Sequence, residues 1–428
     1  MWYDRMSMKR IERIRLYPTH RQSRALGFML DVTRQLYNAA LQERRDAYRM
    51  AKVSITAKRQ YAELTALRQP ATWLDARVAA VYRECEDAVL RRLDLAFAAF
   101  FRRCKRGETP GFPRFKAAAQ WNHIAFPHGD RALRLDERQR RICIPGLGSV
   151  ALRKGRTVPP FGRAWLVQRP SGWYACFECE RAVQPLPPTG VILGVDRGVH
   201  VLAACSDGVL MGNAAVGEKR RAATRRLQRD LEAASIYAGS GRTRRCINRH
   251  DPQRIAAAKR LARAKEREAN ARRNHAHQTS RKIVDRADVI AIEALNVRNM
   301  TRSAKGTMAA PGRNVAAKAG LNRVVLDAGF GLLEQMIVAK AESAARTIVR
   351  VDPRFSSQEC SQCGHIARES RRKRRFVCIA CGFTCHADTN AALVLRGRAE
   401  LRLMSMPHPV EDTGGRAGRA AQAHTTNL

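Results

Sequence analysis

Two pairs of cysteines near the C-terminal end constrain this chain more than any other feature of its sequence. Each pair has Cys-x-x-Cys spacing and fourteen residues separate the pairs, which are formed by Cys360, Cys363, Cys378 and Cys381. A Cys-x-x-Cys turn brings two thiolates to one side of a metal, so this spacing is typical of a tetrahedral structural zinc site. Gly364 and Gly382 directly follow the pairs and suit the tight turns of a zinc ribbon. Buried reduced thiols are the weaker interpretation, and the nearby Cys385 is interpreted as a bystander.

The charge of the chain indicates a polyanionic partner. Its 428 residues carry a formal net charge of +41, from 79 Lys and Arg against 38 Asp and Glu. A compact body with this charge repels itself, and a nucleic acid would relieve the repulsion. No run of about 18 apolar residues could span a bilayer, and the N-terminus lacks a secretory pattern. Because cysteines in metal spacing fit a reducing interior, we expect a cytoplasmic protein with no membrane partner.

The first hundred residues predict a strand followed by helices. Charged and aliphatic residues alternate over residues 9–16, as in a strand with one apolar face. Thr19 and Gln22 then form a capping box for a helix with a 3.6-residue apolar period. A second apolar stripe predicts a helix over residues 78–104, and Gly107 is placed to end it as a left-handed cap.

The next segment predicts a small antiparallel barrel, because short alternating runs are separated by Gly and Pro from residue 107 onward. Its tryptophans could stack on bases, but the barrel core is the better interpretation for Trp121, Trp165 and Trp173. Cys176 and Cys179 also read Cys-x-x-Cys. In a strand, however, residues three apart point to opposite faces, so we expect no metal there.

Three carboxylates share a context that suggests chemistry. Apolar runs end in Asp196 and in Glu293, as buried strands do when they open on a site, and Asp388 begins a predicted helix after the last cysteine pair. Three carboxylates at one sheet edge repel one another unless divalent cations neutralise them. Two Mg²⁺ ions about 3.5–4 Å apart would activate a water and stabilise the leaving oxygen of a phosphodiester. The sequence therefore predicts a magnesium site for phosphodiester hydrolysis.

Two long basic helices are predicted between the two apolar runs. The second has Asp251 as its N-cap and carries ten Lys or Arg residues over 254–282. This excess of one sign favours a surface that tracks phosphates over an ordinary solvated face. Residues 296–319 lack a period and predict a mobile loop beside the site, before a helix over 324–345.

The order of these motifs resembles the split RuvC nuclease of the TnpB (OrfB) family, encoded by small bacterial insertion sequences. Compact type V CRISPR effectors look similar over the same motifs, so both remain open. Arg197 and Ala294 depart from the family pattern, which often has an apolar residue and an acid there. The resemblance covers residues 9–396 and rests on Tyr-Pro-Thr at 17–19, Tyr-Asn-Ala-Ala-Leu at 37–41, Gly-Phe-Pro-Arg-Phe-Lys at 111–116, Gly-Val-Asp-Arg-Gly-Val at 194–199, Ile-Glu-Ala-Leu-Asn-Val at 292–297, the cysteine ribbon, and Ala-Asp-Thr-Asn-Ala-Ala at 387–392.

The resemblance implies an α/β multidomain protein. It would combine an RNase H-like (RuvC) nuclease domain, which contains an inserted zinc ribbon, with a small β-barrel wedge domain and a helical recognition domain. The unpatterned C-terminal segment predicts a disordered tail. The expected boundaries are 1–16 and 107–187 for the wedge, 17–106 for the recognition domain, 188–352 and 387–400 for the nuclease, 353–386 for the ribbon that binds target nucleic acid, and 401–428 for the tail.

The resemblance also implies an RNA-guided DNA endonuclease in the bacterial cytoplasm. Asp196, Glu293 and Asp388 match the catalytic acids that would hold two Mg²⁺ ions, and the four paired cysteines match the ligands of one structural Zn²⁺. Guide RNA and target double-stranded DNA would be its partners. The guide would supply sequence specificity while the protein senses duplex shape and a short flanking motif. We favour a monomer.

Three other functions fit parts of this pattern. An RNA-guided DNA-binding protein could repress transcription without cleavage, although such a protein would be expected to lose one of the three acids. A transposase that cuts and joins DNA uses comparable acids, but the ribbon before the third acid argues against it. A zinc-ribbon RNA-binding protein would not need carboxylates at strand ends. We therefore predict cleavage, with the repressor as the alternative.

Overall fold

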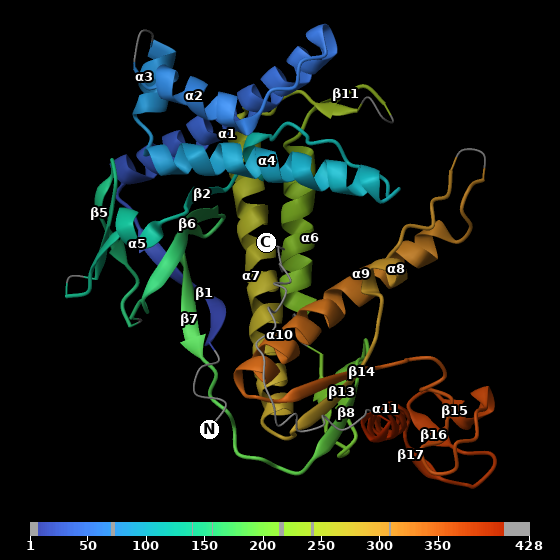
Figure 1. Cartoon of the computed structure of the whole chain (residues 1–428). Helices are drawn as coiled ribbons and strands as arrows, with labels where there is room; N and C mark the ends of the chain where they lie inside the picture. Colours follow the sequence, from blue (N-terminus) through green and yellow to red (C-terminus); the bar gives the residue numbers. More distant parts are fainter. Residues whose placement is uncertain are drawn as a thin grey trace. The chain divides into compact units, whose positions relative to one another are not determined.

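The computed structural model describes residues 7–69, 73–138, 140–155, 157–213, 218–240, 244–307 and 310–405 (Figure 1). The chain divides into two compact units. Unit 1 comprises Met1–Gln184 and Val216–Asn270, and unit 2 comprises Pro185–Ala215 and Ala271–Leu428. Within these described ranges, every helix is too short or too polar to cross a bilayer.

Unit 1 begins with a strand and a bundle of helices: β1 (Ser7–Tyr17), α1 (His20–Ala51), α2 (Ala57–Leu67), α3 (Trp73–Ala79) and α4 (Arg83–Lys105). The predicted capping box is confirmed, because the Gln22 amide donates to Thr19 Oγ1 at 3.3 Å and the Thr19 amide donates to Gln22 Oε1 at 3.1 Å. Gly107 has φ +65°, as its left-handed cap requires. The single helix predicted over 78–104 is wrong, since the chain leaves the helix between α3 and α4. The apolar period continues across this break, so periodicity could not reveal it.

An antiparallel sheet of seven strands forms the rest of this part of unit 1, in the order β2-β6-β7-β1-β5-β4-β3. Strand β1 pairs with β7 from Ser7 to Arg15, and then with β5 at Leu16 and Tyr17. Within the described chain, the edge strands β2 and β3 do not pair with each other, so hydrogen bonds do not close the predicted barrel. Alternation reports which face of a strand is buried, but not whether two edges meet. The other strands are β2 (His123–Phe126), β3 (Arg134–Asp136), β4 (Arg141–Ile144), β5 (Gly148–Leu152), β6 (Phe161–Arg169) and β7 (Gly172–Ala182).

The sheet buries two of the three tryptophans assigned to its core. Trp121 and Trp173 are each 4% exposed, whereas Trp165 is only half-buried. Along β7 the half-buried Cys176 alternates with the buried Cys179, so the two thiols face opposite sides as predicted.

The second segment of unit 1 is a helical hairpin built from α6 (Glu218–Ala233), β11 (Tyr237–Ala238), β12 (Arg245–Cys246) and the first part of α7 (Pro252–Val284). The predicted N-cap is confirmed, because the Arg254 amide donates to Asp251 Oδ1 at 2.7 Å. The remainder of α7 belongs to unit 2.

Unit 2 is built on a five-stranded sheet in the order β10-β9-β8-β13-β14. The three strands β8, β13 and β14 are parallel, and β9 is antiparallel to β8. Helix α11 (Ala387–Met404) packs on this sheet and follows the small sheet β15-β16-β17 in sequence (Figure 1). The strands are β8 (Ile192–Asp196), β9 (Val201–Cys205), β10 (Leu210–Gly212), β13 (Val289–Glu293), β14 (Thr347–Val351), β15 (Arg371–Arg372), β16 (Arg375–Val377) and β17 (Thr384–His386).

Three boundaries in unit 2 differ from those predicted. The loop expected over 296–319 contains α8 (Val297–Met300) and the start of α9 (Val315–Ala328). This helix is mostly exposed and alanine-rich at its start, so it has helical propensity but no apolar stripe to reveal it. The helix expected over 324–345 is interrupted at Gly329, after which α10 (Phe330–Ser343) begins. The tail expected over 401–428 does not begin at residue 401, since α11 continues to Met404; residues 406–428 lie outside the described chain.

Candidate active site

The sheet of unit 2 brings the three predicted carboxylates together. Strands β8 and β13 are adjacent and parallel, with Ile192 paired to Val289, so the carboxyl ends that carry Asp196 and Glu293 meet at one sheet edge. Asp388 lies in the first turn of α11. Its amide donates to Nδ1 of His386, the N-cap residue, at 3.3 Å, which fixes the start of the helix.

A glycine lets α11 approach the sheet closely enough to place Asp388 there. Gly194 lies in the middle of β8, under α11. A Cβ atom at this position would lie 1.9 Å from the carbonyl oxygen of Ala392, so any side chain would push the helix away. The Gly-Val-Asp sequence at 194–196 therefore allows α11 to cross β8 closely and places the carboxylate of Asp196 two residues beyond the crossing.

The negative charge of this site is poorly compensated. Burial, and then the charges of Glu293 and Asp388, raise the pKa of Asp196 to about 8, although Arg371 acts in the opposite direction. Burial also raises the pKa of Glu293, which is 7% exposed. Its Oε2 atom is buried and has no hydrogen-bond partner among the described residues. An unpaired buried carboxylate oxygen is costly, so this edge suits a cation.

The position of Arg371 could not be predicted from the sequence. Its Nη2 atom donates to Asp388 Oδ1 at 2.8 Å, although it belongs to strand β15 of the ribbon. The sequence places this residue in a run of five basic residues, Arg371 to Arg375, which resembles a phosphate-contacting loop. Nothing in that run distinguishes the one side chain that reaches the carboxylates.

Arg197, which departs from the family pattern, holds the main chain at Glu293. Its side chain is fully buried. Its Nη2 atom donates to the main-chain carbonyl of Glu293 at 2.5 Å, and its Nη1 atom donates to Glu334 Oε2 at 2.7 Å. The other oxygen of Glu334 accepts from Arg350 Nε at 3.1 Å. This network joins the ends of β8 and β13 to α10 and β14, and it holds the backbone that carries Glu293.

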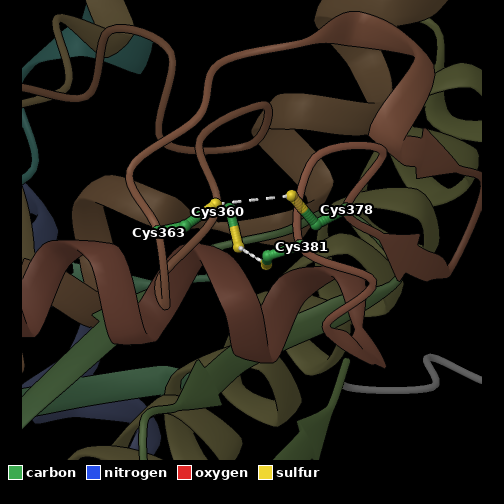
Figure 2. Close-up of side chains that lie close together, drawn as sticks. All are labelled: Cys360, Cys363, Cys378 and Cys381. Atoms are coloured by element: carbon green, nitrogen blue, oxygen red, sulfur yellow. Dashed lines mark hydrogen bonds between the residues drawn. The ribbon is translucent and has the colours of Figure 1, made fainter.

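The four paired cysteines form a separate site, shown in Figure 2. Cys360 Sγ lies 3.7 Å from Cys381 Sγ, and Cys363 Sγ lies 3.6 Å from Cys378 Sγ. Four sulfurs at about 2.3 Å from one tetrahedral zinc are about 3.8 Å apart, so the spacing fits zinc. The ligand atoms of these four cysteines all lie within 4.8 Å of one another, and no other group of three or more candidate ligands in the described chain is that tight. The three carboxylates are spaced more widely than this limit.

The details of the ribbon also suit a metal. Gly364 and Gly382 have φ of +73° and +76°, the left-handed geometry expected after each pair. The pKa of Cys378 is lowered to about 6, first by the amide of Cys381, whereas burial raises the pKa of Cys360 and the neighbouring thiols raise that of Cys381 to about 12. Without a metal, the four sulfurs therefore do not all ionise together, which a bound cation would allow. Cys385 stands outside the group and donates to the carbonyl of His386.

One buried side chain joins the ribbon to α11. Asn390 is fully buried, donates from Nδ2 to the carbonyl of Glu359 at 2.6 Å, and accepts at Oδ1 from the amide of Ser361 at 3.1 Å. These two residues flank Cys360. The ribbon is therefore fastened two residues after Asp388, a role that the motif alone does not predict.

Family models match three parts of the chain. A model described as "Helix-turn-helix domain" matches residues 6–52, one described as "Probable transposase" matches 174–304, and one described as "Cas12f1-like, TNB domain" matches 330–395. The second range contains Asp196 and Glu293. The third contains Asp388 and the four paired cysteines.

Three curated proteins are similar to this chain. "Putative RNA-guided DNA endonuclease InsQ" of Escherichia coli (strain K12) is 32% identical over 306 residues, which cover 71% of each chain. "Putative RNA-guided DNA endonuclease" of Streptomyces pristinaespiralis is 26% identical over 397 residues, covering 90% of this chain and 88% of that one. "CRISPR-associated endodeoxyribonuclease Cas12f1" of Sulfoacidibacillus thermotolerans is 28% identical over 211 residues, covering 47% of this chain and 44% of that one.

Proposed function

Because this chain belongs to the OrfB (TnpB) family of RNA-guided DNA endonucleases, we propose that it cuts double-stranded DNA at the edge formed by Asp196, Glu293 and Asp388. The observation that carries this proposal is the convergence of three carboxylates from distant segments, two of them with raised pKa values. Guide RNA pairing supplies the sequence specificity, and a short flanking motif is read by the protein.

The carboxylates are suited to hold Mg²⁺, which prefers oxygen ligands and keeps waters that phosphate oxygens can replace. When bound, two such ions activate a water and stabilise the leaving oxygen of the phosphodiester. The three carboxylates are spaced more loosely than the cysteine group, and they would share the ions between them. Glu293 offers its unpaired Oε2. The charges of Glu293 and Asp388 both act on Asp196, so a cation bound by Asp196 would also be attracted by the other two acids. Arg371 is placed to contact the phosphate from the side of Asp388.

The cysteine site takes one structural Zn²⁺, which folds the ribbon over 353–386 and, through Asn390, holds α11 in place. We assign residues 188–352 and 387–400 to the RuvC nuclease, 1–16 and 107–187 to the wedge, and 17–106 to the recognition domain; within the nuclease segment, residues 216–270 pack with unit 1. The helices α1–α4 and the seven-stranded sheet support this division of unit 1. Cysteines that bind a metal must stay reduced, so we place the protein in the cytoplasm.

The decisive experiment begins with the RNA that co-purifies with the chain. Its sequence identifies the guide, and a DNA library with the matching target beside randomised flanks then tests cleavage. We expect Mg²⁺-dependent cuts in matched DNA with one flanking motif, and none after chelation or with a mismatched guide. Stable guide-dependent binding of every matched DNA without any cut would instead support the repressor.

A further inference from the structure

Two cavities open along one face of helix α7 in unit 1. The first has a volume of about 560 Å³ and is lined by Lys259, Arg260 and Arg263. The second has a volume of about 380 Å³ and is lined by Arg263, Arg267 and, from strand β1, Arg15. Arg263 lines both cavities, so they lie next to each other on this face of the helix, and together we call them the α7 groove.

The spacing of the α7 cations matches a linear ligand. An α-helix advances 100° per residue, so positions 259, 260, 263 and 267 all fall on one side of the helix. Arg263 and Arg267 are about one turn apart, roughly 6 Å along the axis, so an extended ligand that runs along this face can contact both side chains. Lys265 is exposed and lies on the opposite side of the helix.

The floor of the groove is fixed by the turn between β6 and β7. Arg15 Nη2 donates to the carbonyl of Ser171 at 2.7 Å, and Arg263 Nε donates to the carbonyl of Pro170 at 3.2 Å. Glu266 accepts from both the amide and the hydroxyl of Ser171, at 2.8 and 3.0 Å. The anchored arginines are therefore pre-oriented, and the carboxylate of Glu266 is already engaged.

Several donors in the groove remain free for a ligand. No hydrogen bond or ion pair engages Arg260 or Arg267 within the described parts of the chain, and both side chains are exposed. Around both cavities, five cations face two acids, Asp230 and Glu266. Guanidinium groups pair with phosphate oxygens in two-pronged geometry, and cavities of about 560 and 380 Å³ have room for more than a single ion.

We propose that the α7 groove binds consecutive phosphates of one nucleic-acid strand. The proposal rests on the proposed function, which supplies both guide RNA and DNA as sources of such a strand. The phosphodiester chemistry is shared by the two, so the test has one arm for each.

The test substitutes Arg260→Gln and Arg267→Gln, singly and together, because neither side chain has a partner that folding would lose. Lys265→Gln removes the same charge from the opposite face and is the matched control. In the first arm, the re-synthesised co-purifying RNA is titrated with each purified variant at several salt concentrations. In the second, RNA-loaded protein is titrated with matched DNA. Far-ultraviolet circular dichroism and thermal unfolding check that each variant is folded.

Each lost phosphate contact should reduce the magnitude of the slope of log affinity against log salt by about 0.7 for a single strand. The double variant should reduce it by about twice that amount. A loss in the RNA arm assigns the groove to the guide, and a loss confined to the DNA arm assigns it to the target. Slopes in both arms equal to that of Lys265→Gln overturn the proposal. Because binding is measured apart from cleavage, a wild-type chain that binds but never cuts would contradict the proposed function and not the groove.

Discussion

Arg197 shows how a single buried charge can hold a site together. Its pair with Glu334 and its bond to the Glu293 carbonyl lie beneath the carboxylates, whereas Arg350, the other partner of Glu334, is half exposed. We predict that Arg197→Leu lowers the free energy of unfolding by about 3–5 kcal/mol, because it leaves a largely buried carboxylate without its main partner. Arg350→Leu, the matched control, should cost about 1 kcal/mol or less. Denaturant titrations that give equal losses for both variants would contradict this role.

Glu86 gives unit 1 an unusual dependence on pH. The residue is fully buried and accepts from Arg68 Nη1 at 2.6 Å, but its Oε1 atom has no partner in the described chain. Burial raises the pKa of Glu86 from its ordinary 4.5 to about 7, even though Arg68 acts in the opposite direction. The folded state therefore holds this proton more tightly than the unfolded state, so the residue's contribution to stability falls as pH rises from about 4.5 to about 7.

Glu86→Gln should remove that dependence. We predict that, as pH rises from 5 to 8, the free energy of unfolding of the variant increases by up to about 3 kcal/mol relative to that of wild type, since one pKa unit corresponds to about 1.4 kcal/mol. Unfolding of both proteins in denaturant at the two pH values measures the difference. A gap between wild type and variant that stays constant with pH would show that Glu86 is ionised in the folded state at both.

At the scale of elements, the crossing of α11 over β8 decides where Asp388 lies. Gly194→Ala would place a methyl group against the Ala392 carbonyl, and we predict a loss of about 1–3 kcal/mol in stability. Displacing Asp388 by about 1 Å should also slow DNA cleavage about 100-fold. Gly397→Ala, on the same helix with open space around it, should leave cleavage unchanged. Equal cleavage rates for the two variants would refute the close-approach argument.

The zinc ribbon should depend on four of its five cysteines. Zinc binding contributes on the order of 10 kcal/mol of local folding free energy, so Cys381→Ser should lose the metal and unfold the ribbon. Cys385→Ser, outside the tetrahedral group, should retain one zinc per chain. Metal analysis of the purified variants, combined with limited proteolysis of the ribbon, measures both effects. Full zinc content in Cys381→Ser would remove this thiol from the ligand set.

Local patterns predicted the elements better than the contacts among them. The capping box at Thr19, the N-cap at Asp251 and the strands that end in Asp196 and Glu293 could be read from the sequence, because each depends on neighbouring residues. The break before α4 could not, since the apolar period runs through it. The partners of Arg371, Arg197 and Asn390 were equally hidden, because they lie 17, 137 and 31 residues away in sequence. Side-chain contacts at such separations are set by the tertiary fold.

At the scale of the whole molecule, the net charge of +41 and the acidic edge act on a nucleic acid in opposite directions, by attraction and by repulsion. The cations spread over both units attract a polyanion, as the groove on α7 illustrates, while the three carboxylates concentrate negative charge at one edge of unit 2. A phosphate backbone approaches such an edge favourably only when cations are bound there. Binding and cleavage should therefore be separable by substitution.

The most direct test measures guide-dependent binding and cleavage side by side for Asp196→Asn, Glu293→Gln and Asp388→Asn, each loaded with the co-purifying RNA and given matched DNA with Mg²⁺. If the three carboxylates act jointly, each variant should bind the target with wild-type affinity or better and cut it at least about 1,000-fold more slowly, a loss of about 4 kcal/mol in transition-state stabilisation. A variant that still cuts at the wild-type rate would contradict the account, because its carboxylate would then play no part in cleavage.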